Sequence, residues 1–84
     1  MPGRSELLRE IDQLKGRCHN LEPRDIEAVA RRAGYEYDRT KGSHATYVKA
    51  GHPNLIIKLH DLGGDLARRL LNQIASSLED NDEE

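Results

Sequence analysis

The spacing of apolar residues changes twice along this chain, and these changes limit the possible folds more than any other feature. Before Gly34 the apolar residues recur at the intervals of three and four that are typical of helices. Between Tyr35 and His60 they alternate or cluster as in strands, and after Gly64 the helical spacing returns. The predicted order is helix, helix, three antiparallel strands, helix. We therefore expect an α+β domain in which helices cover one face of a small three-stranded antiparallel sheet.

Capping residues mark the starts of the predicted helices. The first helix is predicted over residues 5–15, with Ser5 as its N-cap. The second begins at Pro23 with Glu22 as its cap, and the third is capped by Asp65. A short amphipathic helix is marginal alone, so the first must bury its apolar side against its own domain or against another chain. The apolar sides of the three consist of Leu7, Leu8, Ile11, Leu14, Ile26, Val29, Ala30, Ala33, Leu66, Leu70, Leu71, Ile74 and Leu78.

Three strands are predicted over residues 35–39, 44–49 and 55–60, separated by turn-forming residues. Because side chains alternate between the two faces of a strand, the apolar bulk assigns the faces. The face covered by helices is expected to hold Tyr35, Tyr37, Ala45, Tyr47, Leu55, Ile57 and Leu59. The open face is expected to hold Glu36, Asp38, His44, Thr46, Val48, Ile56, Lys58 and His60.

The pairing of the last two strands decides which residues of the open face meet. If the second hairpin is centred on His52, His44 lies opposite His60. By the same pairing, Thr46 lies opposite Lys58. Directly opposed residues have Cβ atoms ~5 Å apart, which is close enough for shared chemistry.

Length and composition exclude several classes of protein. The 84 residues leave room for one domain, and the longest aliphatic run, Leu55 to Ile57, is far shorter than a membrane span of ~20 residues. The single cysteine, Cys18, excludes an intramolecular disulfide, and no apolar signal segment follows Met1. We therefore expect a cytoplasmic protein. Since no short-spaced pair of metal ligands is present, no metal is expected.

The net charge of −2 hides an uneven distribution. Five of the 15 acidic residues lie among residues 79–84, which hold no base, so residues 1–78 carry 13 bases and 10 acids. Between Arg31 and His60, six bases stand against two acids. A basic body with an acidic tail favours a polyanionic partner such as a nucleic acid.

From Gly34 onward the chain carries an ordered set of residues spread over several elements. The set comprises Gly34-Tyr35, Arg39, Gly42-Ser43-His44, Tyr47, His60 and Gly64-Asp65-Leu66, followed by the segment from Leu70 to Ile74. It resembles the HicA (YcfA-like) toxin family of type II toxin–antitoxin systems, which are small bacterial mRNA interferases. The resemblance covers residues 23–78. It implies a fold like that of the double-stranded-RNA-binding domain, with the order α-β-β-β-α.

The resemblance implies that His44 is the catalytic histidine of a metal-independent endoribonuclease acting on mRNA, with no cofactor. It also implies a HicB-type antitoxin as the inhibitory partner. Histidine suits proton transfer at RNA hydroxyls because its unperturbed pKa, ~6.5, lies near neutral pH. We predict His60 as a second acid–base group, from its place opposite His44 more than from the family. The candidates to bind phosphate or to stabilise charge at phosphorus are Arg39, Lys41, Gly42, Ser43 and Lys58.

Departures from the family pattern divide the chain further. Residues 1–22 form an extension with a short amphipathic helix, residues 23–78 the HicA-like domain, and residues 79–84 an acidic tail. Asp65 also replaces the family's threonine. Two other functions stay open. One is a protein-interaction domain in which the amphipathic N-terminal helix and the acidic tail dominate, and the other is a non-catalytic nucleic-acid-binding module that uses Lys41, Lys49 and Lys58. The N-terminal helix is also a candidate contact for a homo-oligomer.

Overall fold

The secondary structure follows the predicted order, and the predicted α+β fold is confirmed. The computed structural model describes residues 3–79, so most of the predicted acidic tail lies outside the described residues. The strands form one antiparallel sheet in the order β1-β2-β3. None of the helices in the described range is long and apolar enough to cross a membrane. The elements are α1 (Arg4–Lys15), the short 3-10 helix η1 (Cys18–Asn20), α2 (Pro23–Arg32), β1 (Glu36–Lys41), β2 (His44–Val48), β3 (Leu55–Lys58) and α3 (Gly64–Glu79).

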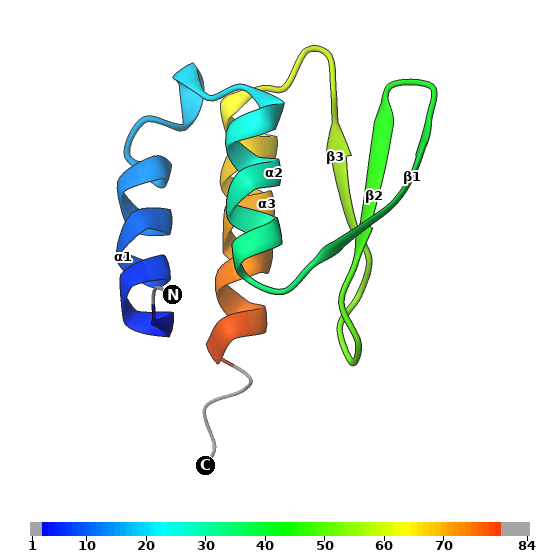
Figure 1. The fold of residues 1–84 in the computed structure, drawn as a ribbon. Coiled ribbons are helices and arrows are strands. Elements are labelled where there is room, and N and C mark those ends of the chain that lie inside the picture. Colours follow the sequence, from blue (N-terminus) through cyan, green and yellow to red (C-terminus); the bar gives the residue numbers. More distant parts are fainter. Residues whose placement is uncertain (1–2, 80–84) are drawn as a thin grey trace.

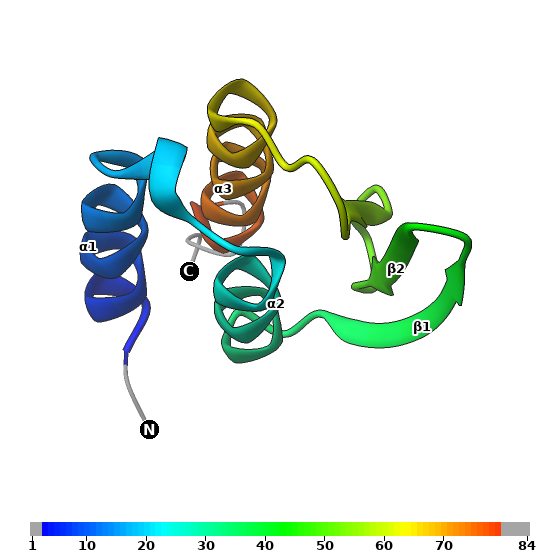
Figure 2. The ribbon, with the colours of Figure 1, turned by 90° about the horizontal axis from the view of Figure 1, so that it is seen from above.

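The elements form three layers (Figures 1 and 2). Helices α2 and α3 lie side by side in the middle layer. The sheet packs on one side of this layer, and α1 packs on the other, where it contacts α3 and α2. The helices therefore cover one face of the sheet and leave the other face open, as predicted.

The N-terminal extension contributes to the same hydrophobic core as the rest of the chain. Leu7, Ile11 and Leu14 of α1 are buried, and so are Cys18 and Leu21 in the segment that leads to α2. The sequence left open whether the first helix packs against its own domain or against another chain. In the structure it packs against its own domain. The apolar side chains predicted for the other two helices are also buried, apart from one that is partly buried, Leu66.

The predicted cap is confirmed at α2 and wrong at α1 and α3. At α2, Glu22 is the N-cap residue, and its backbone N–H donates a hydrogen bond to Asp25 Oδ2 at 2.9 Å. The N-cap of α1 is Gly3, so Ser5 lies inside the first turn. Helix α3 begins before Asp65, which leaves this carboxylate in the first turn, where it still interacts favourably with the helix N-terminus.

The pairing predicted for the last two strands is wrong. His44 pairs with Lys58 instead of His60. Thr46 pairs with Ile56 instead of Lys58. Because β3 ends at Lys58, His60 lies outside the sheet altogether.

A tight turn between β2 and β3 explains the shift. The His52 N–H donates a hydrogen bond to the Lys49 carbonyl at 3.1 Å, and Gly51 has a φ of 82°. A positive φ at the third position of the turn is typical of type II and favours glycine there. The hairpin is therefore centred on Gly51 rather than on His52. Since paired residues are symmetric about the centre of a hairpin, moving the centre by one residue moves each partner by two.

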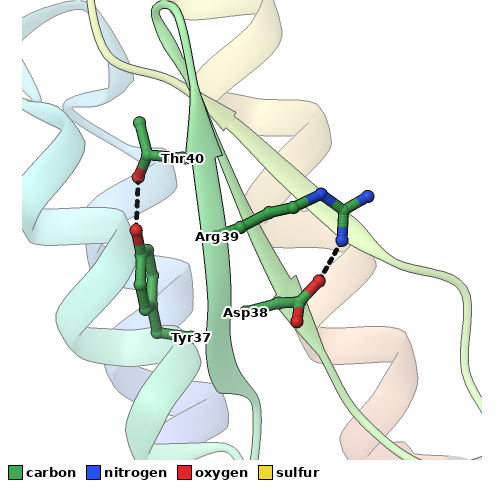
Figure 3. A network of polar contacts seen from close by, with 4 residues as sticks. All are labelled: Tyr37, Asp38, Arg39 and Thr40. Atoms are coloured by element: carbon green, nitrogen blue, oxygen red, sulfur yellow. Dashed lines mark hydrogen bonds and ion pairs between the residues drawn. The ribbon is translucent and has the colours of Figure 1, made fainter.

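A β-bulge in β1 changes which of its residues face the helices. The register with β2 shifts between Tyr37 and Arg39, so Asp38 is an extra residue without a partner in the pairing. Tyr37 and Thr40 extend from one side of the strand, whereas Asp38 and Arg39 extend from the other (Figure 3). Strict alternation would have placed Arg39 on the same face as Tyr37. The bulge moves it to the open face.

Tyr37 is the exception among the residues predicted for the helix-covered face. It pairs with the buried Tyr47, yet it is 51% exposed. The reason is that β1 curves away from α2 (Figure 2), and all six of its residues are exposed. On the open face Thr46, at 8% exposed, is more buried than predicted. The other residues predicted for the covered face are buried or packed against the core: Tyr35, Ala45, Tyr47, Leu55, Ile57 and Leu59.

Candidate active site

The turn between β1 and β2 consists of Gly42 and Ser43. Gly42 has a φ of 62°, and a glycine with positive φ at the first of the two central positions is typical of type II′ hairpin turns. The Leu59 N–H donates a hydrogen bond to the Ser43 carbonyl at 2.7 Å, which ties the turn to the segment after β3. His44, the first residue of β2, is therefore held at a defined place at this end of the sheet.

His44 lies between two lysines of the neighbouring strands. It pairs with Lys41 across the β1–β2 hairpin and with Lys58 across the β2–β3 hairpin. Directly paired residues extend from the same face with Cβ atoms ~5 Å apart, so these three side chains share the open face. Arg39, which pairs with Thr46, lies on this face as well. We call Arg39, Lys41, His44 and Lys58 the basic cluster.

The side chains of the basic cluster are accessible to a ligand. Arg39, Lys41 and His44 are exposed, and Lys58 is partly exposed. Arg39 forms an ion pair with Asp38 (Figure 3). Among residues 3–79, the side chains of the other three have no hydrogen-bond or ion-pair partner. Two lysines without acidic partners beside a histidine form a surface that attracts anions.

His60 is not brought opposite His44. It lies in a bend after β3 and is exposed. The two histidines therefore do not form the facing pair on which the prediction of a second acid–base group rests. The hydrogen bond between Leu59 and Ser43 nevertheless keeps this segment at the end of the sheet where His44 lies. A catalytic role for His60 stays a prediction.

A polar contact under the sheet links α2 to β2 and has no counterpart in the sequence patterns. Arg31 Nη2 donates a hydrogen bond to the Tyr47 hydroxyl at 3.2 Å. Burial raises the pKa of this hydroxyl, and the hydrogen bond from Arg31 opposes the shift. The ring of Tyr37 meets that of Tyr47 edge-on, with centroids 5.6 Å apart and an interplanar angle of 71°. The only sequence signal was the place of Arg31 in the last turn of α2.

His19 and Cys18, the histidine and the cysteine of the N-terminal extension, have packing contacts within the fold. A Cβ atom added to Gly64 would overlap the ring of His19, so glycine at the start of α3 permits close packing of the extension. Cys18 is buried, with its Sγ 3.7 Å from Arg68 Nη2. Over the described part of the chain, no group of three or more His, Cys, Asp or Glu residues is placed to hold a metal ion.

The fold and the site together define a small α+β domain with a basic cluster beside a glycine turn, and comparison with known families shows which family has this domain. The family model of the HicA toxin of bacterial toxin–antitoxin systems matches residues 23–80, more than half of the chain. The protein therefore belongs to the HicA toxin family. Searches of curated proteins and of solved structures gave no significant match. The matched range includes the whole sheet and the basic cluster, whereas α1 precedes it.

Proposed function

We propose that the protein is an endoribonuclease that cleaves mRNA by histidine acid–base catalysis without a metal ion. A HicB-type antitoxin inhibits it by covering His44. The observation that carries the proposal is the pairing of His44 with Lys41 and Lys58 on the open face of the sheet. Membership of the HicA toxin family supports a toxin with an antitoxin partner.

The reaction begins at the ribose 2′ hydroxyl next to the scissile phosphate. Neutral His44 accepts the 2′ proton, and O2′ attacks phosphorus. Lys41 and Lys58, on either side of His44, stabilise the additional negative charge on the phosphate oxygens. The bond from phosphorus to O5′ breaks, and O5′ takes up a proton. The products are a 2′,3′-cyclic phosphate end and a 5′ hydroxyl end.

Two features beside His44 support this chemistry. Apart from Gly42 itself and its two chain neighbours, nothing lies within 4 Å of the position that a Cβ atom of Gly42 would take, so a phosphate can approach the backbone of the turn closely. His60 is the candidate donor of the proton to O5′, because the hydrogen bond between Leu59 and Ser43 keeps its segment beside the turn.

Incubation of the purified protein with RNA in the presence of a chelator tests the proposal. The variants are His44→Ala and, as a matched control, His52→Ala, whose histidine lies in the turn between β2 and β3. We expect the wild type and His52→Ala to cleave RNA to 5′ hydroxyl ends. His44→Ala should bind RNA but not cleave it. Lys58→Ala should lower kcat about tenfold, with partial recovery in Lys58→Arg.

Three outcomes would count against the proposal in different ways. Cleavage by His44→Ala at the wild-type rate would contradict the role of this histidine. Products with 5′ phosphate ends would contradict attack by the 2′ hydroxyl. RNA binding without cleavage by the wild type would favour the non-catalytic nucleic-acid-binding module.

The antitoxin requires a separate measurement. In a complex with a HicB-type protein, His44 should be protected from acylation by diethyl pyrocarbonate, whereas the free protein should be modified there. Peptide mass spectrometry locates the modified histidines. Modification of His44 at equal rates in the free protein and in the complex would show that the partner covers another surface.

A further inference from the structure

Tyr37 is a large aromatic side chain that is exposed and yet held in place. It is 51% exposed. Its hydroxyl shares a hydrogen bond with Thr40 Oγ1 at 2.7 Å (Figure 3), and the ring meets that of Tyr47 edge-on, with centroids 5.6 Å apart. Because these contacts hold the side chain at its hydroxyl and against Tyr47, little side-chain entropy remains to be lost when a ligand binds to it.

The exposure of Tyr37 results from the shape of the sheet rather than from a loop. Strand β1 is an edge strand, and all six of its residues are exposed. It curves away from the helix layer (Figure 2), and about half of the Tyr37 side chain remains exposed. The bulge at Asp38 places Tyr37 on the face of β1 opposite to Arg39 (Figure 3). Both faces of the same edge strand therefore carry groups suited to binding.

Positive side chains lie next to the ring that Tyr37 contacts and further along its strand. Arg31 of α2 donates a hydrogen bond to the hydroxyl of Tyr47, the ring that Tyr37 contacts. Lys41, which pairs with His44, is four residues further along β1. At ~3.3 Å per residue, Tyr37 is about 13 Å along the strand from this pair. Because Tyr37 extends from the other face of β1, the RNA must pass around this edge of the sheet, and a nucleotide a few positions from the scissile phosphate can span the separation.

We propose that Tyr37 stacks on a base of single-stranded RNA whose scissile phosphate lies at His44. The proposal rests on the proposed function and adds a residue that binds bases at the β1 edge. Aromatic rings bind the faces of unpaired bases with little regard to sequence, and neighbouring cations attract the phosphates. A base within a duplex is already stacked on its neighbours, so this contact selects single-stranded RNA.

Variants of Tyr37 in the His44→Ala background test the proposal without cleavage of the RNA. Tyr37→Phe keeps the aromatic ring, and Tyr37→Leu keeps an apolar side chain without the ring. Fluorescence anisotropy of a dye-labelled RNA of about 12 nucleotides measures affinity, with its duplex as a second probe. We expect Tyr37→Leu to weaken binding of the single strand about fivefold or more, and Tyr37→Phe to bind like its parent. Duplex binding should be the same in all three.

Tyrosine emission gives a second readout that a merely structural role would not change. The chain has three tyrosines and no tryptophan, and Tyr35 and Tyr47 are only 2% and 1% exposed. A base stacked on Tyr37 should quench the emission of this residue when unlabelled RNA is added. Tyr37→Phe should bind the RNA without that quenching. Both proteins in this comparison keep the ring, so the result does not depend on the stability of Tyr37→Leu.

The outcomes separate this proposal from the proposed function. Equal affinity of Tyr37→Leu and its parent for the single strand, or equal quenching in Tyr37→Phe, would overturn stacking while leaving cleavage by the wild type intact. A loss of antitoxin affinity in Tyr37→Leu with unchanged RNA affinity would assign the ring to a protein partner instead. If Tyr37→Leu weakens RNA binding but the wild type cleaves nothing, stacking holds and the nuclease reaction fails. No RNA binding by the wild type would overturn both.

Discussion

Replacement of Ile11 by alanine tests whether α1 is an integral part of the domain. Ile11 is 1% exposed and belongs to the core where α1 contacts α3. The substitution removes three buried carbon atoms, which corresponds to about 2.4 kcal/mol at ~0.8 kcal/mol per buried CH₂ group. The cavity left behind adds to this loss, so we expect the free energy of unfolding to fall by about 3 kcal/mol. A chain of this size has a total stability of about 4–12 kcal/mol, so the loss is a large share of it.

The size of the loss in unfolding free energy distinguishes a helix that is integral to the domain from one that is only loosely docked. If α1 were loosely docked, it would detach when Ile11 is truncated, and the rest of the domain would unfold as before. The measured loss could then not exceed the small free energy with which α1 docks. A loss of about 3 kcal/mol therefore requires that α1 unfold together with the sheet and the other helices.

Urea unfolding followed by two probes measures the loss in unfolding free energy and shows whether α1 unfolds together with the rest of the domain. Far-ultraviolet circular dichroism reports on the helices, whereas tyrosine emission reports on the sheet half, where all three tyrosines lie. We expect one shared transition with a lower midpoint and an unchanged slope. Gln13→Ala, at an exposed position of the same helix, should change stability by no more than about 0.5 kcal/mol. A loss below about 1 kcal/mol for Ile11→Ala, or separate transitions for the two probes, would refute the reasoning.

Two further predictions concern stability. Gly64→Ala should lower the free energy of unfolding by about 1–3 kcal/mol, because the new Cβ overlaps the ring of His19. In a His19→Ala background the same substitution should be neutral or stabilising, and equal effects in both backgrounds, measured as a double-mutant cycle, would contradict this. Burial raises the pKa of Tyr47, so above pH ~10 the unfolded chain loses this proton first, and stability should fall as the pH rises. The slope of unfolding free energy against pH should be less negative in Tyr47→Phe, and an unchanged slope would contradict the effect of burial.

Local sequence patterns were sufficient to predict that the three helices exist, because the contacts that stabilise a helix form within a turn or two of the chain. At α2, Pro23 at the first position and the hydrogen bond from Glu22 to Asp25 involve neighbours in sequence. The starts of α1 and α3 differ by one or two residues from the predicted caps. A helix can extend by a residue when its flank accepts helical geometry, so the apolar pattern does not determine its first residue.

The faces and the register of the strands depend on partners that are distant in sequence. The alternation of residues 35–39 indicates a strand but does not show the extra residue at Asp38, because a bulge is defined by how β1 pairs with β2. Tyr37 is apolar enough to predict burial, and only the path of β1 past α2 leaves it exposed. The register between β2 and β3 follows from the turn at Gly51, whose one-residue shift the sequence pattern alone did not reveal.

The candidate site combines a motif of consecutive residues with side chains that come from distant parts of the sequence. Gly42, Ser43 and His44 are consecutive, so the turn and the histidine were apparent from the sequence. The place of Lys58 opposite His44 depends on the corrected register, and the position of Arg39 on the same face depends on the bulge. The prediction that the two histidines face each other is wrong for the same reason, because a register shift of two residues replaces His60 by Lys58 opposite His44.

The position of α1 limits how this helix can influence the proposed RNA cleavage. Helix α1 and the open face of the sheet lie on opposite sides of the α2–α3 layer (Figure 1). Packed helix and sheet layers are each separated by about 10 Å, so α1 cannot reach across to cover His44. Helix α1 would therefore act on the proposed cleavage through the stability of the fold: Ile11→Ala should lower the fraction of folded protein while folded molecules keep their kcat. A partner that covers His44 has the open face and the β1 edge available, since α1 already occupies the far side of the helix layer.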